Sequence, residues 1–145
     1  MMKRVTVFFA MALPLSLIAL PALGGSFSMS CYFPSKKCGS EVTDIVTDRF
    51  TTRYPSGKWQ IVVLAEFTPY SNGGGVGYAI AGVSNKPSSQ QVPDFLPRQR
   101  FVSTSRIVGR NIPPTEVAAE TRRLVRDAVE QMMAACDNSP DCKID

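Results

Sequence analysis

Hydrophobic positions between Pro114 and Cys136 recur with the 3.6-residue period of an α-helix. Apolar and small side chains fall on one continuous arc of the helical wheel, and most of the charged side chains fall opposite. The apolar arc holds Val117, Ala118, Thr121, Leu124, Val125, Ala128, Val129, Met132, Ala135 and Cys136. An arc of this width predicts a long amphipathic helix that packs across a sheet.

Three upstream segments have the apolar patterns of strands, namely Trp59–Tyr70, Val76–Asn85 and Arg98–Gly109. The first is apolar on both faces at its centre, as is typical of a central strand. Turn residues lie before and after it, in the stretches 54–58 and 71–75. The second is rich in small residues, which predicts close approach of the helix.

The segment Glu41–Tyr54 fits two structures. A helix would place Val42, Ile45, Val46 and Phe50 on one face, whereas Val46, Phe50 and Tyr54 with the adjacent threonines match a strand. We favour a strand from about Ile45 that forms a hairpin with Trp59, and leave a helix over residues 41–50 open. A helix here would give the order helix, three strands, helix, which is similar to that of double-stranded-RNA-binding domains. That similarity is confined to topology, because the last helix lacks a lysine cluster at its start.

The fold prediction is therefore α+β. It consists of an antiparallel meander of three to four strands, covered on one face by the long C-terminal helix, with disulfides near both ends. Residues 1–24 are expected to form a leader, 25–40 an irregular arm held by a disulfide, and 41–145 a single α+β domain.

The N-terminal residues have the pattern of a secretory signal peptide. Lys3-Arg4 precedes the apolar run Val5–Leu20, and small residues in 21–24 favour cleavage after Gly24. A membrane anchor is the alternative, but the apolar run is short for a bilayer span of about 20 residues. We therefore expect an exported protein, periplasmic or secreted, without a stable membrane span after cleavage.

Export favours disulfides for the cysteines, which number four: Cys31, Cys38, Cys136 and Cys142. We favour the local pairs Cys31–Cys38 and Cys136–Cys142, because each short loop contains a proline. The alternative pairing would join the N-terminal arm to the end of the helix. Zinc and other metals are not expected, since the spacings are unusual and histidine is absent.

Composition excludes several functional classes. The absence of histidine excludes Ser-His-Asp and Cys-His catalysis. Loss of Lys3 and Arg4 with the leader lowers the net charge from +4 to +2, so nucleic acid is not an expected partner. A small hydrolase that uses carboxylates alone stays as an alternative, with Glu66, Asp44 and Asp48 as its candidates. We expect no catalysis and no cofactor.

Arginines supply the candidate partner-binding residues. Arg49 and Arg53 share a face of the first expected strand, and Arg100, Arg106 and Arg110 share a face of the last. They are expected on the sheet face that the helix leaves open, as a surface for an anionic partner, although an ordinary solvated face is the simpler interpretation.

The resulting hypothesis is a small non-catalytic protein that binds another envelope or secreted protein. It would act as an inhibitor, an immunity factor or a secretion-system accessory. The alternative is a binding module for a small ligand or an envelope glycan, with Trp59, Tyr70 and Tyr78 as stacking surfaces.

Overall fold

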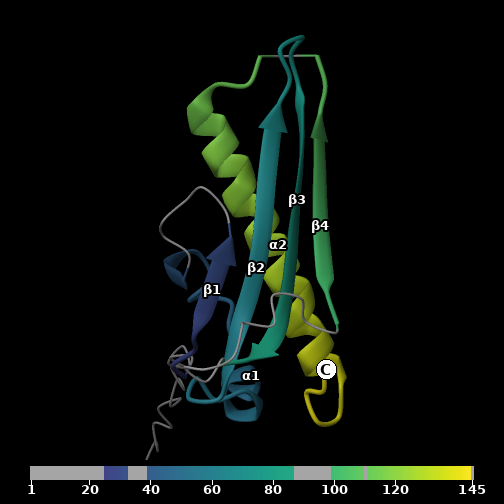
Figure 1. The fold of residues 1–145 in the computed structure, drawn as a ribbon. Helices are drawn as coiled ribbons and strands as arrows, with labels where there is room; N and C mark the ends of the chain where they lie inside the picture. Colours follow the sequence, from purple (N-terminus) through teal and green to yellow (C-terminus); the bar gives the residue numbers. More distant parts are fainter. Residues whose placement is uncertain (1–24, 33–38, 87–98, 110, 145) are drawn as a thin grey trace, which may run out of the picture.

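The computed structural model describes residues 25–32, 39–86, 99–109 and 111–144. In chain order the elements are strand β1 (Met29–Tyr32), the 3-10 helix η1 (Gly39–Glu41), helix α1 (Asp48–Arg53), strands β2 (Trp59–Pro69), β3 (Gly75–Asn85) and β4 (Phe101–Ile107), and helix α2 (Pro114–Asn138). The strands form one sheet in the order β1-β2-β3-β4, and α2 crosses one of its faces (Figure 1). The predicted α+β architecture is confirmed.

The sheet is mixed and not a purely antiparallel meander. Strands β2, β3 and β4 are antiparallel to one another, as predicted, but β1 pairs with β2 in parallel, with Cys31 opposite Val63. Strand β1 also lies within the arm that was expected to be irregular. A parallel pair needs a long crossover connection, and the segment between β1 and β2 contains η1 and α1.

The prediction of a strand from about Ile45 to Tyr54 is wrong, because this segment contains helix α1. The buried side chains Val42, Val46, Phe50 and Tyr54 recur every fourth residue, which is the spacing of a helical face. Thr47 caps the helix, since its hydroxyl accepts a hydrogen bond from the Phe50 amide at 3.3 Å. The turn at 54–58 therefore joins a helix to β2.

Helix α2 and the facing side of the sheet form the core. The helix buries Thr121, Leu124, Val125, Ala128, Val129, Met132, Met133 and Cys136, and all of these except Met133 belong to the predicted arc. Gly77, Ala79 and Ala81 of β3 lie beneath it and are buried. The small residues that predicted close approach therefore lie where α2 crosses the sheet.

The chain after α2 folds back onto α1. Cys136 and Cys142 form a disulfide, as predicted, and Ile144 is buried with its amide donating to the Tyr54 hydroxyl at 3.0 Å. Cys31 is also disulfide-bonded, whereas its predicted partner Cys38 lies outside the described residues. Disulfides suit an exported protein.

In the part of the chain that the structure describes, neither helix combines the length and hydropathy needed to cross a bilayer.

Candidate interaction surface

The sheet face opposite α2 carries a row of apolar side chains that runs across all four strands. The register places Tyr32 of β1 beside Leu64 of β2, Leu64 beside Ile80 of β3, and Ile80 beside Val102 of β4. Side chains alternate between the two faces of a strand, so these four residues share the face that α2 leaves open. We call this set the apolar row.

The open face carries further exposed apolar side chains next to the row. Tyr78 and Val76 follow Ile80 at alternate positions of β3 and therefore point to the same side. Tyr32, Val76, Tyr78 and Val102 are each between 40% and 47% exposed. Large apolar side chains this exposed, and adjacent to one another, mark a surface suited to contact with another molecule.

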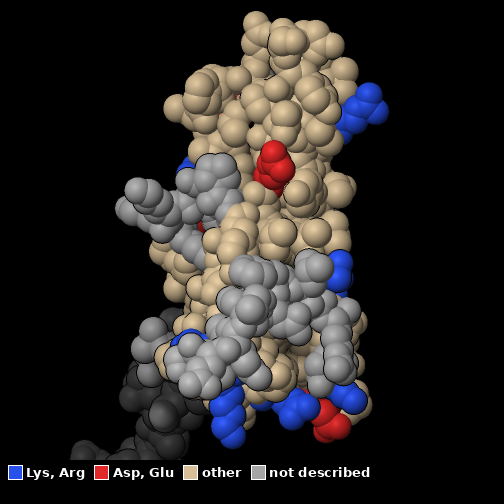
Figure 2. All heavy atoms as spheres, viewed as in Figure 1, with Lys and Arg blue, Asp and Glu red and all other residues tan. Residues whose placement is uncertain are grey.

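Among the described residues, the register places Thr68 beside Val76 and Thr104 beside Tyr78, together with two charged neighbours. Glu66 lies opposite Tyr78, and Arg106 lies opposite Val76, so one acid and one base border the apolar side chains. Figure 2 shows this face, and its upper half is formed mainly by uncharged residues. The patch is therefore an apolar surface with a thin polar rim, as at the centre of protein–protein interfaces.

The half of the open face nearer the start of β2 has a different character. Gln60, Val62 and Ser84 are buried there. Ser30 donates to Gln60 Oε1 at 2.8 Å, and Gln60 Nε2 donates to Ser84 Oγ at 3.4 Å. These bonds satisfy the buried polar groups, as burial requires. Among the described residues, the exposed apolar side chains of this face thus lie toward the hairpin between β2 and β3.

Arg49, a predicted partner-binding residue, binds the chain's own C-terminal loop. Its guanidinium donates to the carbonyl oxygens of Asp137, Ser139 and Pro140 at 3.0, 2.5 and 2.8 Å. Carbonyl groups at the end of a helix lack partners within the helix and carry its negative dipole end, which a cation stabilises. Arg49 therefore acts as a C-terminal cap on α2, 88 residues later in the chain.

The other predicted arginines are not gathered on one face. Arg53 lies on α1 with its guanidinium carbon 5.6 Å from the centre of the Tyr54 ring. Arg100 is exposed just before β4, and Arg106 is exposed on the open face. Arg110 lies outside the described residues. The prediction that Arg49 and Arg53 lie on a strand, on the same sheet face as Arg106, is wrong, because both lie on helix α1. Helix α1 and the end of β4 lie at opposite ends of the molecule (Figure 1).

The candidate carboxylates have separate environments. Asp44 accepts two hydrogen bonds from Arg126 at 2.8 and 2.9 Å. Hydrogen bonding to the Arg126 guanidinium holds the pKa of Asp44 below its usual range. Asp48 accepts a hydrogen bond from the Gly25 amide, and Glu66 is exposed on the open face. The first two side chains thus join segments of the chain, which is a structural task.

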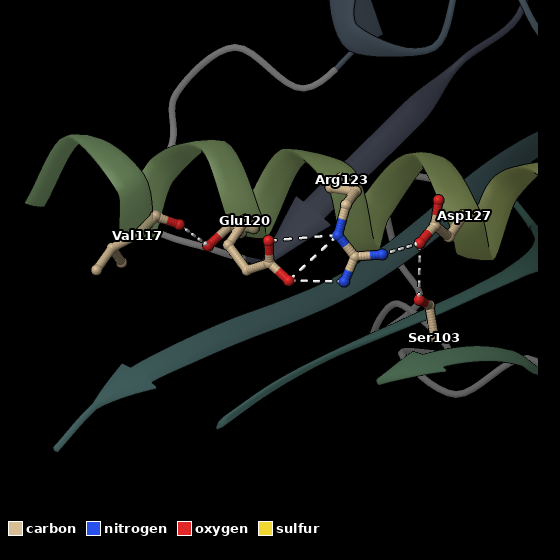
Figure 3. A network of polar contacts seen from close by, with 6 residues as sticks. Ser103, Val117, Glu120, Arg123 and Asp127 are labelled. Carbon is tan, nitrogen blue, oxygen red and sulfur yellow. Dashed lines mark hydrogen bonds and ion pairs between the residues drawn. The ribbon is translucent and has the colours of Figure 1, made fainter. Parts of the chain in front are cut away.

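A polar network links α2 to β4 at the edge of the sheet (Figure 3). Arg123 donates to Glu120 at 2.6 Å and to Asp127 at 2.5 Å, and Ser103 of β4 donates to Asp127 at 3.4 Å. The hydrogen bonds to Glu120 raise the pKa of Arg123 above its ordinary value. The acid–base pairs are one helical turn apart, so the network is the usual pairing along a helix surface extended to one strand hydroxyl.

The aromatic residues proposed as stacking surfaces divide between core and surface. The Trp59 ring packs edge-on against Tyr54, with ring centres 5.2 Å apart, and belongs to the margin of the core. Tyr70 and Tyr78 are exposed, but Tyr70 lies just after β2, at the start of the hairpin loop, whereas Tyr78 lies on the open face. Tyr78 is therefore the one of the three that belongs to the patch.

The sequence analysis missed the apolar row, although the sequence contains a signal for it. Apolar residues on both faces of the central strands require two covers, and the chain has one long amphipathic helix to supply them. Val76, Tyr78 and Ile80 alternate in β3 with the small residues under α2. The sequence could not show that Tyr32 belongs to the apolar row, because its position depends on the parallel pairing of β1 with β2.

Comparison with protein families, with curated proteins and with solved structures finds no match for this chain.

Replacement of Arg49 by alanine is expected to lower the free energy of unfolding by about 1 kcal/mol, because carbonyl groups at the end of α2 lose a charged donor. Urea unfolding monitored by circular dichroism would measure the change. Arg122→Ala, which removes an exposed arginine from α2 itself, is the matched control and should change little. Equal effects of the two substitutions would contradict the capping role.

Proposed function

We propose that this chain is a small exported protein without catalytic activity that binds another envelope or secreted protein through the open face of its sheet. The observation that carries the proposal is the apolar row with Tyr78 and Val76 beside it. The site is thus an apolar patch on the sheet, in place of the arginine surface expected from the sequence.

The chemistry of the patch favours a protein partner with an apolar surface of its own. Tyrosine is enriched at protein interfaces, because its ring adds a large apolar area and its hydroxyl stays able to form hydrogen bonds. Tyr32 and Tyr78 both lie on this face. The charges of Glu66 and Arg106 beside the patch would orient the partner on this surface more than they would raise its affinity. The small-ligand and glycan alternatives become outcomes of the test.

Export supports the choice of partner. The leader pattern of residues 1–24 and the Cys136–Cys142 disulfide both fit a protein that works in an oxidising compartment. A partner encountered there would be an envelope or secreted protein. Inhibitor, immunity factor and secretion-system accessory are the roles that such binding would serve.

Substitution of the patch should abolish partner capture without affecting folding. Val102→Lys and Tyr78→Lys place charges in the patch, where removal of a buried interface tyrosine typically costs about 2 kcal/mol, or about thirtyfold in affinity. The processed wild-type protein and each variant would be immobilised and exposed to an envelope fraction of the source cells. Bound proteins would then be quantified by mass spectrometry. We expect one stoichiometric protein that both lysine variants lose.

The matched control is Val108→Lys, which adds the same charge at an exposed valine just after β4. It should retain the partner. Equal capture by the wild-type protein and both patch variants would refute the proposed surface. Capture of glycan in place of protein, lost in Tyr78→Lys, would favour the alternative function.

A further inference from the structure

The first residue that the structure describes is held by a carboxylate far along the chain. The backbone nitrogen of Gly25 donates a hydrogen bond to Asp48 Oδ1 at 2.9 Å. Asp48 is the first residue of α1, 23 positions later. The bond therefore joins the start of the described chain to the crossover between β1 and β2.

The position of Gly25 is fixed by close packing. A Cβ atom at this residue would lie 2.5 Å from Thr51 Oγ1, which is closer than real Cβ atoms come to a neighbouring atom. The Thr51 side chain is itself fixed, because it is buried and its hydroxyl donates to the Asp48 carbonyl at 3.1 Å. Glycine is thus the residue that fits beside Asp48.

The residues after Gly25 are attached to the domain one after another. The Ser26 and Ser56 hydroxyl oxygens are 3.3 Å apart, and Phe27 packs against the core. The Ser28 carbonyl accepts a hydrogen bond from the Ile61 amide at 2.8 Å, one residue before β1 begins. Contacts with the rest of the domain therefore extend back to Gly25.

The nitrogen that faces Asp48 is the atom that leader removal would change. The leader pattern predicts cleavage of the bond between Gly24 and Gly25. Hydrolysis of that bond adds water, leaves a carboxylate on Gly24, and converts the Gly25 amide nitrogen to a primary amine that takes up a proton. We propose that this ammonium group pairs with the Asp48 carboxylate, so that Asp48 is the binding site of the mature amino terminus.

The ammonium group suits this position better than the amide does. An amide donates one hydrogen bond, whereas an ammonium donates three and adds a full positive charge opposite the carboxylate, so that a Coulomb attraction is added to the hydrogen bond. Among the residues that the structure describes, those lining the hollow next to Gly25 are uncharged, namely Gly25, Ser26, Phe27, Met29, Gly39 and Thr43. Arg49, the cation next to Asp48 in the chain, is directed to the C-terminal loop. Within the described part of the chain, Asp48 is therefore the charged side chain bonded to the Gly25 nitrogen.

The pairing would steady the edge of the binding surface. Strand β1 has four residues and ends with Tyr32, the first member of the apolar row. Chain termini fray unless they are tied down, and the pair would anchor the chain four residues before β1. Leader removal would thereby stabilise the strand that supplies Tyr32. This inference rests on the proposed export of the chain, and the two can be tested separately.

The test uses the full chain produced in cells that export and process it. Mass spectrometry of the purified protein should give Gly25 as the first residue. An NMR titration of the Gly25 resonances should then give an α-amino pKa above the ordinary value of about 7.7–8.0. Asp48→Asn should return it to that range, whereas Asp141→Asn, at an exposed acid of the C-terminal loop, should not change it.

A second measurement stands even if Asp48→Asn folds poorly. Selective acetylation of the α-amino group in the processed wild-type protein should lower the melting temperature at pH 6. The stabilisation should fade as pH rises through the raised α-amino pKa, because the deprotonated amine no longer attracts the carboxylate. An unchanged melting temperature, or the same titration in Asp48→Asn and wild type, would overturn the pairing while a Gly25 terminus upheld export. Cleavage at a different bond of the leader region would overturn the pairing alone, and a chain that keeps its leader would overturn both.

Discussion

Leu124→Asp should abolish the cooperative thermal unfolding of this protein. Leu124 is fully buried on α2, and its side chain lies against Gly77 of β3. The substitution removes about 1.5–3 kcal/mol of apolar burial. It also places a carboxylate among apolar side chains, and an unpaired buried charge costs several kcal/mol more. The sum rivals the entire stability of a typical domain, which is about 5–15 kcal/mol.

Circular dichroism during heating would measure this effect, with a sloping signal and no transition in the variant. Ala118→Asp is the matched control. It makes a similar change on the same helix, at a position that the helical wheel placed on the apolar arc but that is exposed in the structure. It should melt cooperatively, close to wild type. A normal melt of Leu124→Asp would mean that α2 is not docked on the sheet.

The contrast between Leu124 and Ala118 shows what the period of apolar residues can and cannot predict about burial. A pattern repeated over the 25 residues of α2 averages out local exceptions, so the helix and its buried face could be predicted. Its first turns are more exposed than its middle, since Val117 is half-buried and Ala118 exposed. That difference depends on where the sheet ends beneath the helix, which a helical wheel does not contain.

The error over residues 45–54 has a different cause. Val46, Phe50 and Tyr54 are spaced by four, a spacing that returns to the same face in a helix and also in a strand. A short segment therefore leaves the pattern ambiguous. Two features favour the helix over the strand. Thr47 caps the helix, and the parallel pairing of β1 with β2 requires a crossover connection between them. Strand β1 has only four residues, and its structure depends on its partner more than on its own sequence.

At the candidate site, too, features that depend on contacts between distant parts of the chain could not be predicted, whereas features that depend on the size of each residue could. Arg49 was predicted to be an exposed cation that binds a partner. It binds backbone carbonyl groups about 90 residues away, and no local sequence pattern predicts contacts at that separation. The apolar row is likewise a property of strand register. In contrast, the small residues of β3 could be interpreted correctly, because close packing under a helix limits side-chain size at each position separately.

Gly77→Val should lower the free energy of unfolding by about 3 kcal/mol, near the upper end of the usual cost of overpacking. A Cβ atom at residue 77 would lie 2.5 Å from Phe67 Cδ2, 2.8 Å from Leu124 Cδ1 and 2.9 Å from the Glu66 carbonyl oxygen. The first two atoms belong to buried side chains with little room to turn. The third belongs to the backbone of β2 and cannot move without disturbing the sheet.

Urea unfolding of Gly77→Val and of Gly57→Ala would isolate the packing effect. Among the described residues beyond its two chain neighbours, no atom lies within 4 Å of the position a Cβ would take at Gly57, so that variant should stay within about 0.5 kcal/mol of wild type. Valine is a better strand former than glycine, which by itself would stabilise β3. A large loss of stability in Gly77→Val would therefore show that α2 packs closely against β3. Stability equal to wild type would mean that α2 lies farther from β3, and the apolar face it covers would then be less completely buried.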